Sequence, residues 1–191
     1  MHTPWGKSQH SKRFGRGIVS YGTAGHGGFH VSKALLATMP DYMRVADVHA
    51  DGNAGWFEED SAWSLVTTCF PDRFTEQDRE AAKETLRGTY PDAYERFYGV
   101  VLQPGESHAK DKRQFHIDHA GDYLVLSAFG DWHEKLPKGS VGVFAGKGGR
   151  TPTGQFPAEC KWFLVPEAEY NGDIVLSRSD EYIYPEIEAL A

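Results

Sequence analysis

Short runs of apolar residues separated by glycines predict strands in the first part of the chain. Residues 13–21 hold apolar and aromatic side chains around two glycines, which is typical of a short strand bounded by turns. Residues 29–31 are expected to pair with this run as a hairpin. Residues 23–28, between the two runs, are too rich in glycine for a helix or a regular strand, so we expect a loop there.

Apolar residues at the spacing of a helix occupy the middle of the chain. Thr75 begins the clearest example, residues 75–90, because it is a good N-cap and acidic side chains follow it in the first turns. Ser32 begins a short helix over residues 33–39, which a proline ends. Residues 61–70 fit the same spacing, although their β-branched residues would also suit a strand, and we expect a short helix.

The last third of the chain returns to strand patterns. A helix is expected over residues 107–120, followed by four strands separated by clusters of glycine and proline: residues 123–129, 141–145, 162–165 and 174–176. The chain is therefore predicted to be one α+β domain over residues 1–191. It has an N-terminal β-hairpin, a helical middle and a C-terminal antiparallel β-meander, and residues 167–191 form an acidic C-terminal segment.

Composition narrows the class of protein. The 191 residues are 40% hydrophobic, which is enough for one ordinary core. No stretch is long and apolar enough to cross a membrane, and the N-terminus lacks the apolar stretch of a signal peptide, so we expect a cytoplasmic protein without membrane contact. Cys69 and Cys160 form no Cys-x-x-Cys pattern, which makes a disulfide scaffold and a zinc ribbon unlikely.

Charge is distributed unevenly along the chain, whose net charge is −7. Residues 1–40 carry five basic groups and no acid, whereas residues 167–191 carry seven acids against one arginine. Affinity for phosphate needs an excess of Lys and Arg on one face, so direct nucleic-acid binding is expected only of the basic N-terminal arm. The acidic segment is either a solvated terminus that aids solubility or a surface for a basic partner protein.

The loop Gly25-His26-Gly27-Gly28 is the most unusual local feature. Three glycines around one imidazole would let the backbone approach a ligand closely, while the imidazole can accept or donate a proton. The loop lacks the patterns of a dinucleotide site and of a phosphate-binding P-loop. The simpler alternative is a tight hairpin with glycines at positive φ and a surface histidine at its tip.

Glu58, Glu59 and Asp60 lie between large aromatic residues, an environment that can raise the pKa of a carboxyl group toward that of a general acid. One of these acids with His26 would form an acid/base pair. The alternative is that they are first-turn acids of a helix that the aromatic residues dock on the core.

Two further patterns are weak. His116 and His119 lie on one face of the predicted helix, but no third ligand has a persuasive spacing, so we expect no metal and no cofactor. Ser107-x-x-Lys110 matches a catalytic dyad pattern without its companion elements and is attributed to chance.

Four blocks of sequence together carry a family resemblance: Thr3-Pro4-Trp5-Gly6-x-Ser8-Gln9, Thr23-Ala24-Gly25-His26-Gly27-Gly28, Trp56-Phe57-Glu58-Glu59-Asp60 and Phe163-Leu164-Val165-Pro166. The chain resembles an uncharacterised domain-of-unknown-function family of proteobacterial conjugative plasmids, integrative elements and phages. The resemblance implies a bacterial host and a setting of mobile DNA, often among accessory genes for plasmid maintenance and resistance to host defence. It implies no reaction and no catalytic residues.

Three hypotheses of function follow. The first is an accessory protein that inhibits a host defence complex, of anti-CRISPR or anti-restriction type, by presenting an acidic, aromatic-rich surface to a nucleoprotein complex or nuclease. Its expected binding residues are Trp56, Glu167, Glu169, Asp173, Asp180, Glu181, Glu186 and Glu188. The alternative is a small hydrolase or transferase that uses His26 with Glu58, Glu59 or Asp60, provided that they converge in a concave pocket. A DNA-handling factor that uses the basic arm is the third.

Overall fold

The computed structural model describes the chain except residues 46–47, 51–52, 152, 173, 179–180 and 191, and it describes residues 48–50 and 53–54 by their backbone alone. The chain divides into two compact units, Met1–Asp111 and Lys112–Ala191. Helix α5 (His108–Asp118) spans the boundary between them. The expectation of a single domain stays a prediction.

The N-terminal unit contains an antiparallel five-stranded sheet. Its strands in spatial order are β3 (His10–Arg13), β4 (Ile18–Gly22), β5 (Gly27–Val31), β7 (Asn53–Glu58) and β6 (Val48–Ala50). The expected hairpin is confirmed as the β4–β5 pair, with two differences in its bounds. The first run, residues 13–21, includes the end of β3 and the turn to β4, and β5 already begins at Gly27, inside the expected loop. A separate short hairpin precedes the sheet and consists of β1 (His2–Thr3) and β2 (Gly6–Lys7).

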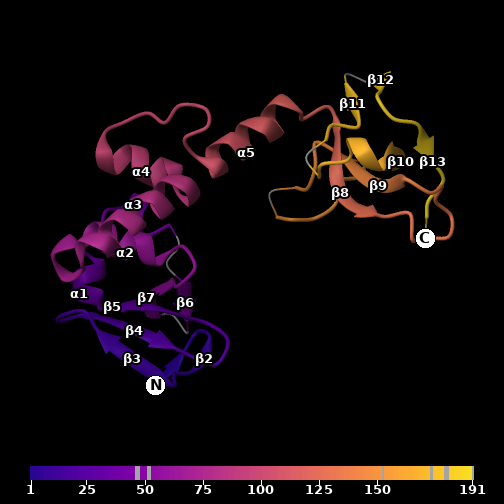
Figure 1. Cartoon of the computed structure of the whole chain (residues 1–191). Helices are drawn as coiled ribbons and strands as arrows, with labels where there is room; N and C mark the ends of the chain where they lie inside the picture. Colours follow the sequence, from indigo (N-terminus) through magenta and orange to yellow (C-terminus); the bar gives the residue numbers. More distant parts are fainter. Residues whose placement is uncertain (46–47, 51–52, 152, 173, 179–180, 191) are drawn as a thin grey trace. The chain divides into compact units, whose positions relative to one another are not determined.

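Helices lie over one face of this sheet, as Figure 1 shows. They are α1 (Lys33–Leu36), η1 (Asp41–Met43), α2 (Trp63–Cys69), η2 (Pro71–Arg73), α3 (Glu76–Thr89) and α4 (Pro91–Tyr98). The clearest predicted helix is confirmed: Thr75 accepts a hydrogen bond from the backbone N–H of Asp78, and Asp78 accepts one in return, which completes a capping box. Between the sheet and the helices lies a core that includes Ile18, Val31, Phe57 and Leu65.

The second face of the sheet carries aromatic rings. Trp56 contacts Tyr21 and His30 there, with ring centroids 5.6 and 4.6 Å apart. Trp5, from the turn between β1 and β2, packs on this group with its centroid 5.9 Å from that of Trp56. Gly28 makes this packing possible, because a Cβ atom there would lie 2.3 Å from both the Trp5 ring and the Phe57 carbonyl oxygen.

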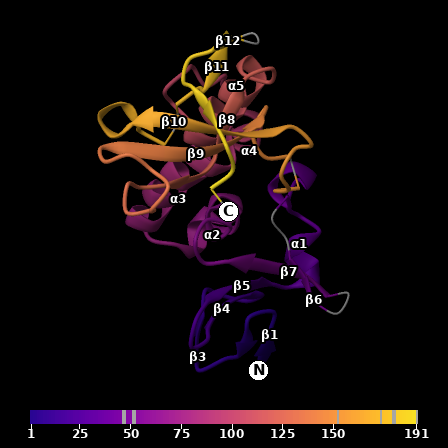
Figure 2. The same ribbon diagram turned by 90° about the vertical axis from the view of Figure 1, so that its right-hand side faces the viewer.

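The C-terminal unit is built on a four-stranded antiparallel sheet, whose strands Figure 2 shows from a second side. In spatial order they are β13 (Glu186–Ile187), β10 (Cys160–Pro166), β9 (Ser140–Lys147) and β8 (Tyr123–Phe129). Strand β8 has the predicted bounds. Residues 174–176 form no strand, although Val175 makes an isolated bridge to Leu124. With strands at both ends and helices between them, the predicted α+β class is confirmed.

The acidic segment is folded onto this sheet. After η3 (Glu167–Glu169), strands β11 (Ser177–Arg178) and β12 (Glu181–Tyr182) pair with each other, and β13 pairs with β10. Leu176 and Leu190 are buried. The described part of the segment is therefore folded, in contrast to the alternative of a free solvated terminus, because apolar residues between the acids anchor it.

We predict that Gly28→Ala lowers the free energy of unfolding by about 1–3 kcal/mol, since the added methyl group meets a backbone carbonyl that cannot rotate away. Gly25→Ala is the matched control, because a Cβ at position 25 meets nothing within 4 Å. Chemical denaturation of the two variants measures the difference. Equal stabilities would contradict the packing of Trp5 on Gly28.

Candidate functional site

The register of β5 and β7 brings together residues that lie about thirty positions apart in the sequence. Gly28 pairs with Glu58, and the backbone N–H of Glu59 donates to the carbonyl of Gly27 at 3.1 Å. The residue before β5, His26, thus faces the residues that follow β7. His26, Glu58, Glu59 and Asp60, called the His26 cluster below, therefore meet at one end of the sheet.

Distances within the His26 cluster are short. His26 Nδ1 lies 3.5 Å from Glu59 Oε1, and these side chains are 31% and 50% exposed. One ligand atom each from His26, Glu58 and Asp60 lie within 4.8 Å of one another. All four residues of the enzymatic alternative are thus brought together. Thr23 holds the loop of His26 in place, since its hydroxyl donates to the His26 carbonyl and accepts from the His26 N–H.

Glu58 has a different role from the one expected of it. Its Oε1 accepts hydrogen bonds from the backbone N–H groups of Ser61 and Ala62 and from the Ser61 hydroxyl, at 2.7–2.9 Å, and its Oε2 accepts from the N–H of Asp60. Burial acts to raise the pKa of Glu58, but these hydrogen bonds together lower it below its ordinary value. The expectation of a raised pKa is wrong for Glu58, which remains a carboxylate at neutral pH.

The alternative that these three acids form the first turn of a helix is wrong. Glu58 ends strand β7, Glu59 and Asp60 form the turn, and α2 begins only at Trp63. The carboxylate of Glu58 thus fixes the turn between the strand and the helix. Ser61, which donates to it, also shares a hydrogen bond with the Tyr90 hydroxyl at 2.9 Å.

An open recess of about 670 Å³ lies beside the His26 cluster. Its lining residues are Trp5, Lys7, Ser8, Gln9, Thr23, Ala24 and Gly25. Trp5 and Gly25 adjoin His26, with the Trp5 and His26 rings 5.5 Å apart, but none of the four cluster residues lines the recess. The four residues thus converge, as the enzymatic alternative requires, but this recess lies beside them and not around them.

A second candidate surface lies in the C-terminal unit and was not expected from the sequence. Five aromatic residues form a continuous series of ring contacts, with centroid distances of 5.1–6.2 Å. In order along the series, which we call the aromatic row, they are Trp132, Phe129, Trp162, Phe144 and Phe156. The ends are the most open, because Trp132 is 73% and Phe156 53% exposed.

The aromatic row lies on the sheet face opposite the core of the C-terminal unit. Residues 141, 143 and 145 of β9 point into that core, and the alternate residues Gly142, Phe144 and Gly146 therefore point the other way. Leu136 and Leu190 pack over Gly142, and Pro157 packs over Gly146. Between these two covered ends the rings of the row are only partly buried. The sequence does contain a signal for this second apolar face: from residue 141 to residue 146, β9 holds only apolar residues and glycine, so neither of its faces is polar.

The predicted acidic binding residues are mostly surface groups. Glu167, Glu169, Glu181, Glu186 and Glu188 are exposed, while Asp173 and Asp180 lie outside the described residues. Glu186 accepts a hydrogen bond from Lys161 at 2.7 Å, and Glu169 accepts one from the Tyr184 hydroxyl. Trp56, by contrast, is only 4% exposed and supports Trp5 from within the N-terminal unit.

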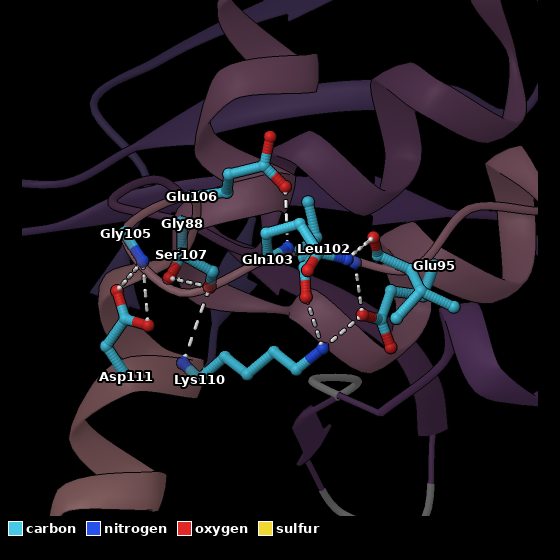
Figure 3. Close-up of polar contacts among 10 residues, drawn as sticks. Gly88, Glu95, Leu102, Gln103, Gly105, Glu106, Ser107, Lys110 and Asp111 are labelled. Carbon is cyan, nitrogen blue, oxygen red and sulfur yellow. Dashed lines mark hydrogen bonds and ion pairs between the residues drawn. The ribbon is translucent and has the colours of Figure 1, made fainter.

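The other residues that the sequence marks as possible nucleophiles or ligands make contacts that stabilise the fold or are partly buried. Figure 3 shows that the ammonium group of Lys110 binds Glu95 and the Leu102 carbonyl, while the Ser107 hydroxyl accepts from the Lys110 backbone N–H and donates to the Gly88 carbonyl. The two contacts of the ammonium group are 2.6 and 2.8 Å long. Ser107-x-x-Lys110 is thus a helix-start contact. His119 Nδ1 lies 2.7 Å from Asp122 Oδ2. Burial raises the pKa of the Cys69 thiol to about 12, which removes it as a nucleophile.

The sequence profile of a protein family described as a domain of unknown function, DUF7007, matches residues 1–120. The chain belongs to this family. No curated protein and no solved structure matches the chain. The DUF7007 match covers the whole N-terminal unit with its His26 cluster, and most of the C-terminal unit lies outside it. The mobile-element setting implied by the resemblance stays a prediction.

No helix among the described residues is long and apolar enough to span a bilayer.

We predict that Glu58→Gln lowers the free energy of unfolding by about 1–2 kcal/mol at pH 7, because hydrogen bonds to a charged acceptor are lost. The pKa of Glu58 is lowered from 4.5 in the folded protein, so its carboxylate stabilises the fold above that pH and loses this effect as the pH falls through the lower folded value. Denaturation at several pH values should show the two proteins converging below about pH 4.5.

Glu59→Gln is the control for this experiment. It changes the neighbouring carboxylate, which is half-exposed and binds none of the turn N–H groups, so a change within about 0.5 kcal/mol is expected. A Glu58→Gln variant as stable as the control at pH 7 would show that the turn does not need the carboxylate.

Proposed function

We propose that this DUF7007 protein acts by binding another protein through its C-terminal unit. The observation that carries the proposal is the aromatic row, whose two ends, Trp132 and Phe156, are 73% and 53% exposed. Contiguous exposed apolar area is uncommon on a protein that has no partner, and tryptophan is enriched among the residues that dominate binding energy. The row therefore supplies the anchor of the interface.

Charge supports a basic partner. Glu167, Glu181 and Glu188 are exposed and form no ion pair among the described residues. Exposed carboxylates accelerate association with a positively charged partner more than they tighten the final complex. The expected partner surface presents apolar side chains flanked by Lys and Arg.

Inhibition of a host defence complex is the narrower form of this proposal. Nucleoprotein defence complexes and nucleases hold nucleic acid in basic grooves, and an acidic surface with an aromatic anchor can occupy such a groove. The support for this form is the chemistry of the surface together with the resemblance to a mobile-element family.

The enzymatic alternative has support from one observation, the convergence of His26 with Glu58, Glu59 and Asp60. It needs a proton donor as well as a base, and Glu58 is held as a carboxylate by four hydrogen bonds. The adjoining recess is lined by other residues. For these reasons we place binding ahead of acid/base catalysis.

We predict that Trp132→Ala and Phe156→Ala each weaken capture of the partner by at least about 30-fold, as expected for residues that anchor an interface. Full-length wild-type protein and both variants would be used as bait in a lysate of the source organism, and dissociation constants for a captured protein measured by surface plasmon resonance. Neither variant should lose much stability, because both rings are exposed.

Phe97→Ala is the control, since Phe97 is an exposed aromatic residue, 39% accessible, in the N-terminal unit. Replacing Glu167, Glu181 and Glu188 by glutamine should slow association, and the effect should shrink toward about 0.5 M salt. A partner that binds both row variants as tightly as wild type would contradict the proposal. So would a partner that Phe97→Ala weakens to the same degree.

A further inference from the structure

The His26 cluster combines donors that come from two separate segments of the N-terminal unit. His26 precedes β5, while Glu58 and Asp60 flank the end of β7. One imidazole nitrogen and two carboxylate oxygens lie within 4.8 Å of one another, and Glu59 adds a third carboxylate 3.5 Å from the imidazole. We propose that the cluster binds a divalent first-row transition-metal ion, such as Mn²⁺ or Zn²⁺.

The donor set determines the class of ion. Ca²⁺ and Mg²⁺ are bound by oxygen ligands, whereas an imidazole nitrogen among carboxylates suits Mn²⁺, Fe²⁺ or Zn²⁺. Donors about 2.1 Å from one ion lie roughly 3–4 Å apart. A small movement of the exposed Asp60 side chain would therefore bring the donor atoms to the spacing that one bound ion requires.

The charge of the cluster calls for a cation. Among the residues that the structure describes, no lysine or arginine forms an ion pair with Glu58, Glu59 or Asp60, whereas His26 pairs with Glu59. Three close carboxylates repel one another, and a divalent ion removes that repulsion.

The backbone around the cluster is fixed by contacts that do not use the proposed ligand atoms of His26 and Asp60. Thr23 anchors the loop through the backbone of His26, and the N–H of Asp60, rather than its carboxylate, is bound to Glu58. Gly27 provides the space for Glu59: a Cβ atom there would lie 2.4 Å from Glu59 Oε2. The ligands are thus held near one another before any ion binds, which reduces the entropic cost of binding.

The test is a titration of the untagged full-length protein with MnCl₂ at neutral pH, in which electron paramagnetic resonance measures free Mn²⁺. We expect one Mn²⁺ per chain with a dissociation constant below about 0.1 mM, the range of weak carboxylate sites. Asp60→Asn and His26→Gln should each weaken binding by at least about tenfold, as the loss of one ligand predicts. Both variants leave the hydrogen bonds of Glu58 in place, so circular dichroism should show them folded.

His119→Gln is the matched control, because it breaks another His–carboxylate pair, His119 with Asp122, that belongs to no larger ligand cluster among the described residues. It should bind Mn²⁺ as wild type does. The proposal is overturned if wild-type protein shows no saturable site, or if Asp60→Asn and His26→Gln bind with unchanged affinity. It is also overturned if the His119 variant alone loses binding.

Discussion

The C-terminal sheet has two apolar faces, and within the described residues of its own unit only one of them is completely covered. Val143, Ala145, Phe163 and Val165 are fully buried on the first face. On the second face, Leu136 and Leu190 close one end over Gly142, and Pro157 closes the other over Gly146, which leaves the aromatic row between them. A sheet stabilised on one side can keep such a row open, and this constraint is the basis of the proposed interaction surface.

In the N-terminal unit, one carboxylate fixes the turn between the sheet and helix α2. Glu58 ends β7 and gathers the N–H groups of the following turn, so the chain can reverse direction and start α2. The same contacts place Asp60 opposite His26. A group that looks like a candidate acid in the sequence is thus a structural anchor that positions the other members of its cluster, and it is a carboxylate at neutral pH.

Local signals in the sequence predicted local structure well. Thr75 with acids in the following turn defined α3, and the apolar run of residues 123–129 defined β8 with the correct bounds. Strand β7 was missed because its acidic end resembles the first turn of a helix. The meeting of His26 with Asp60 depends on the register of two strands, and the pKa of Glu58 depends on turn N–H groups. Neither can be derived from residue types alone.

Exposure of the aromatic row in the intact chain is the premise of the proposed function, and tryptophan fluorescence measures it directly. The chain has five tryptophans, of which Trp132 is 73% exposed and Trp56 is 4% exposed. Trp5, Trp63 and Trp162 are partly exposed, so Trp132 is the most accessible of the five, and Trp132→Phe should clearly lower the slope of acrylamide quenching of the full-length protein. An unchanged quenching slope in this variant would mean that the row is covered in the intact protein and would contradict its role as a binding surface.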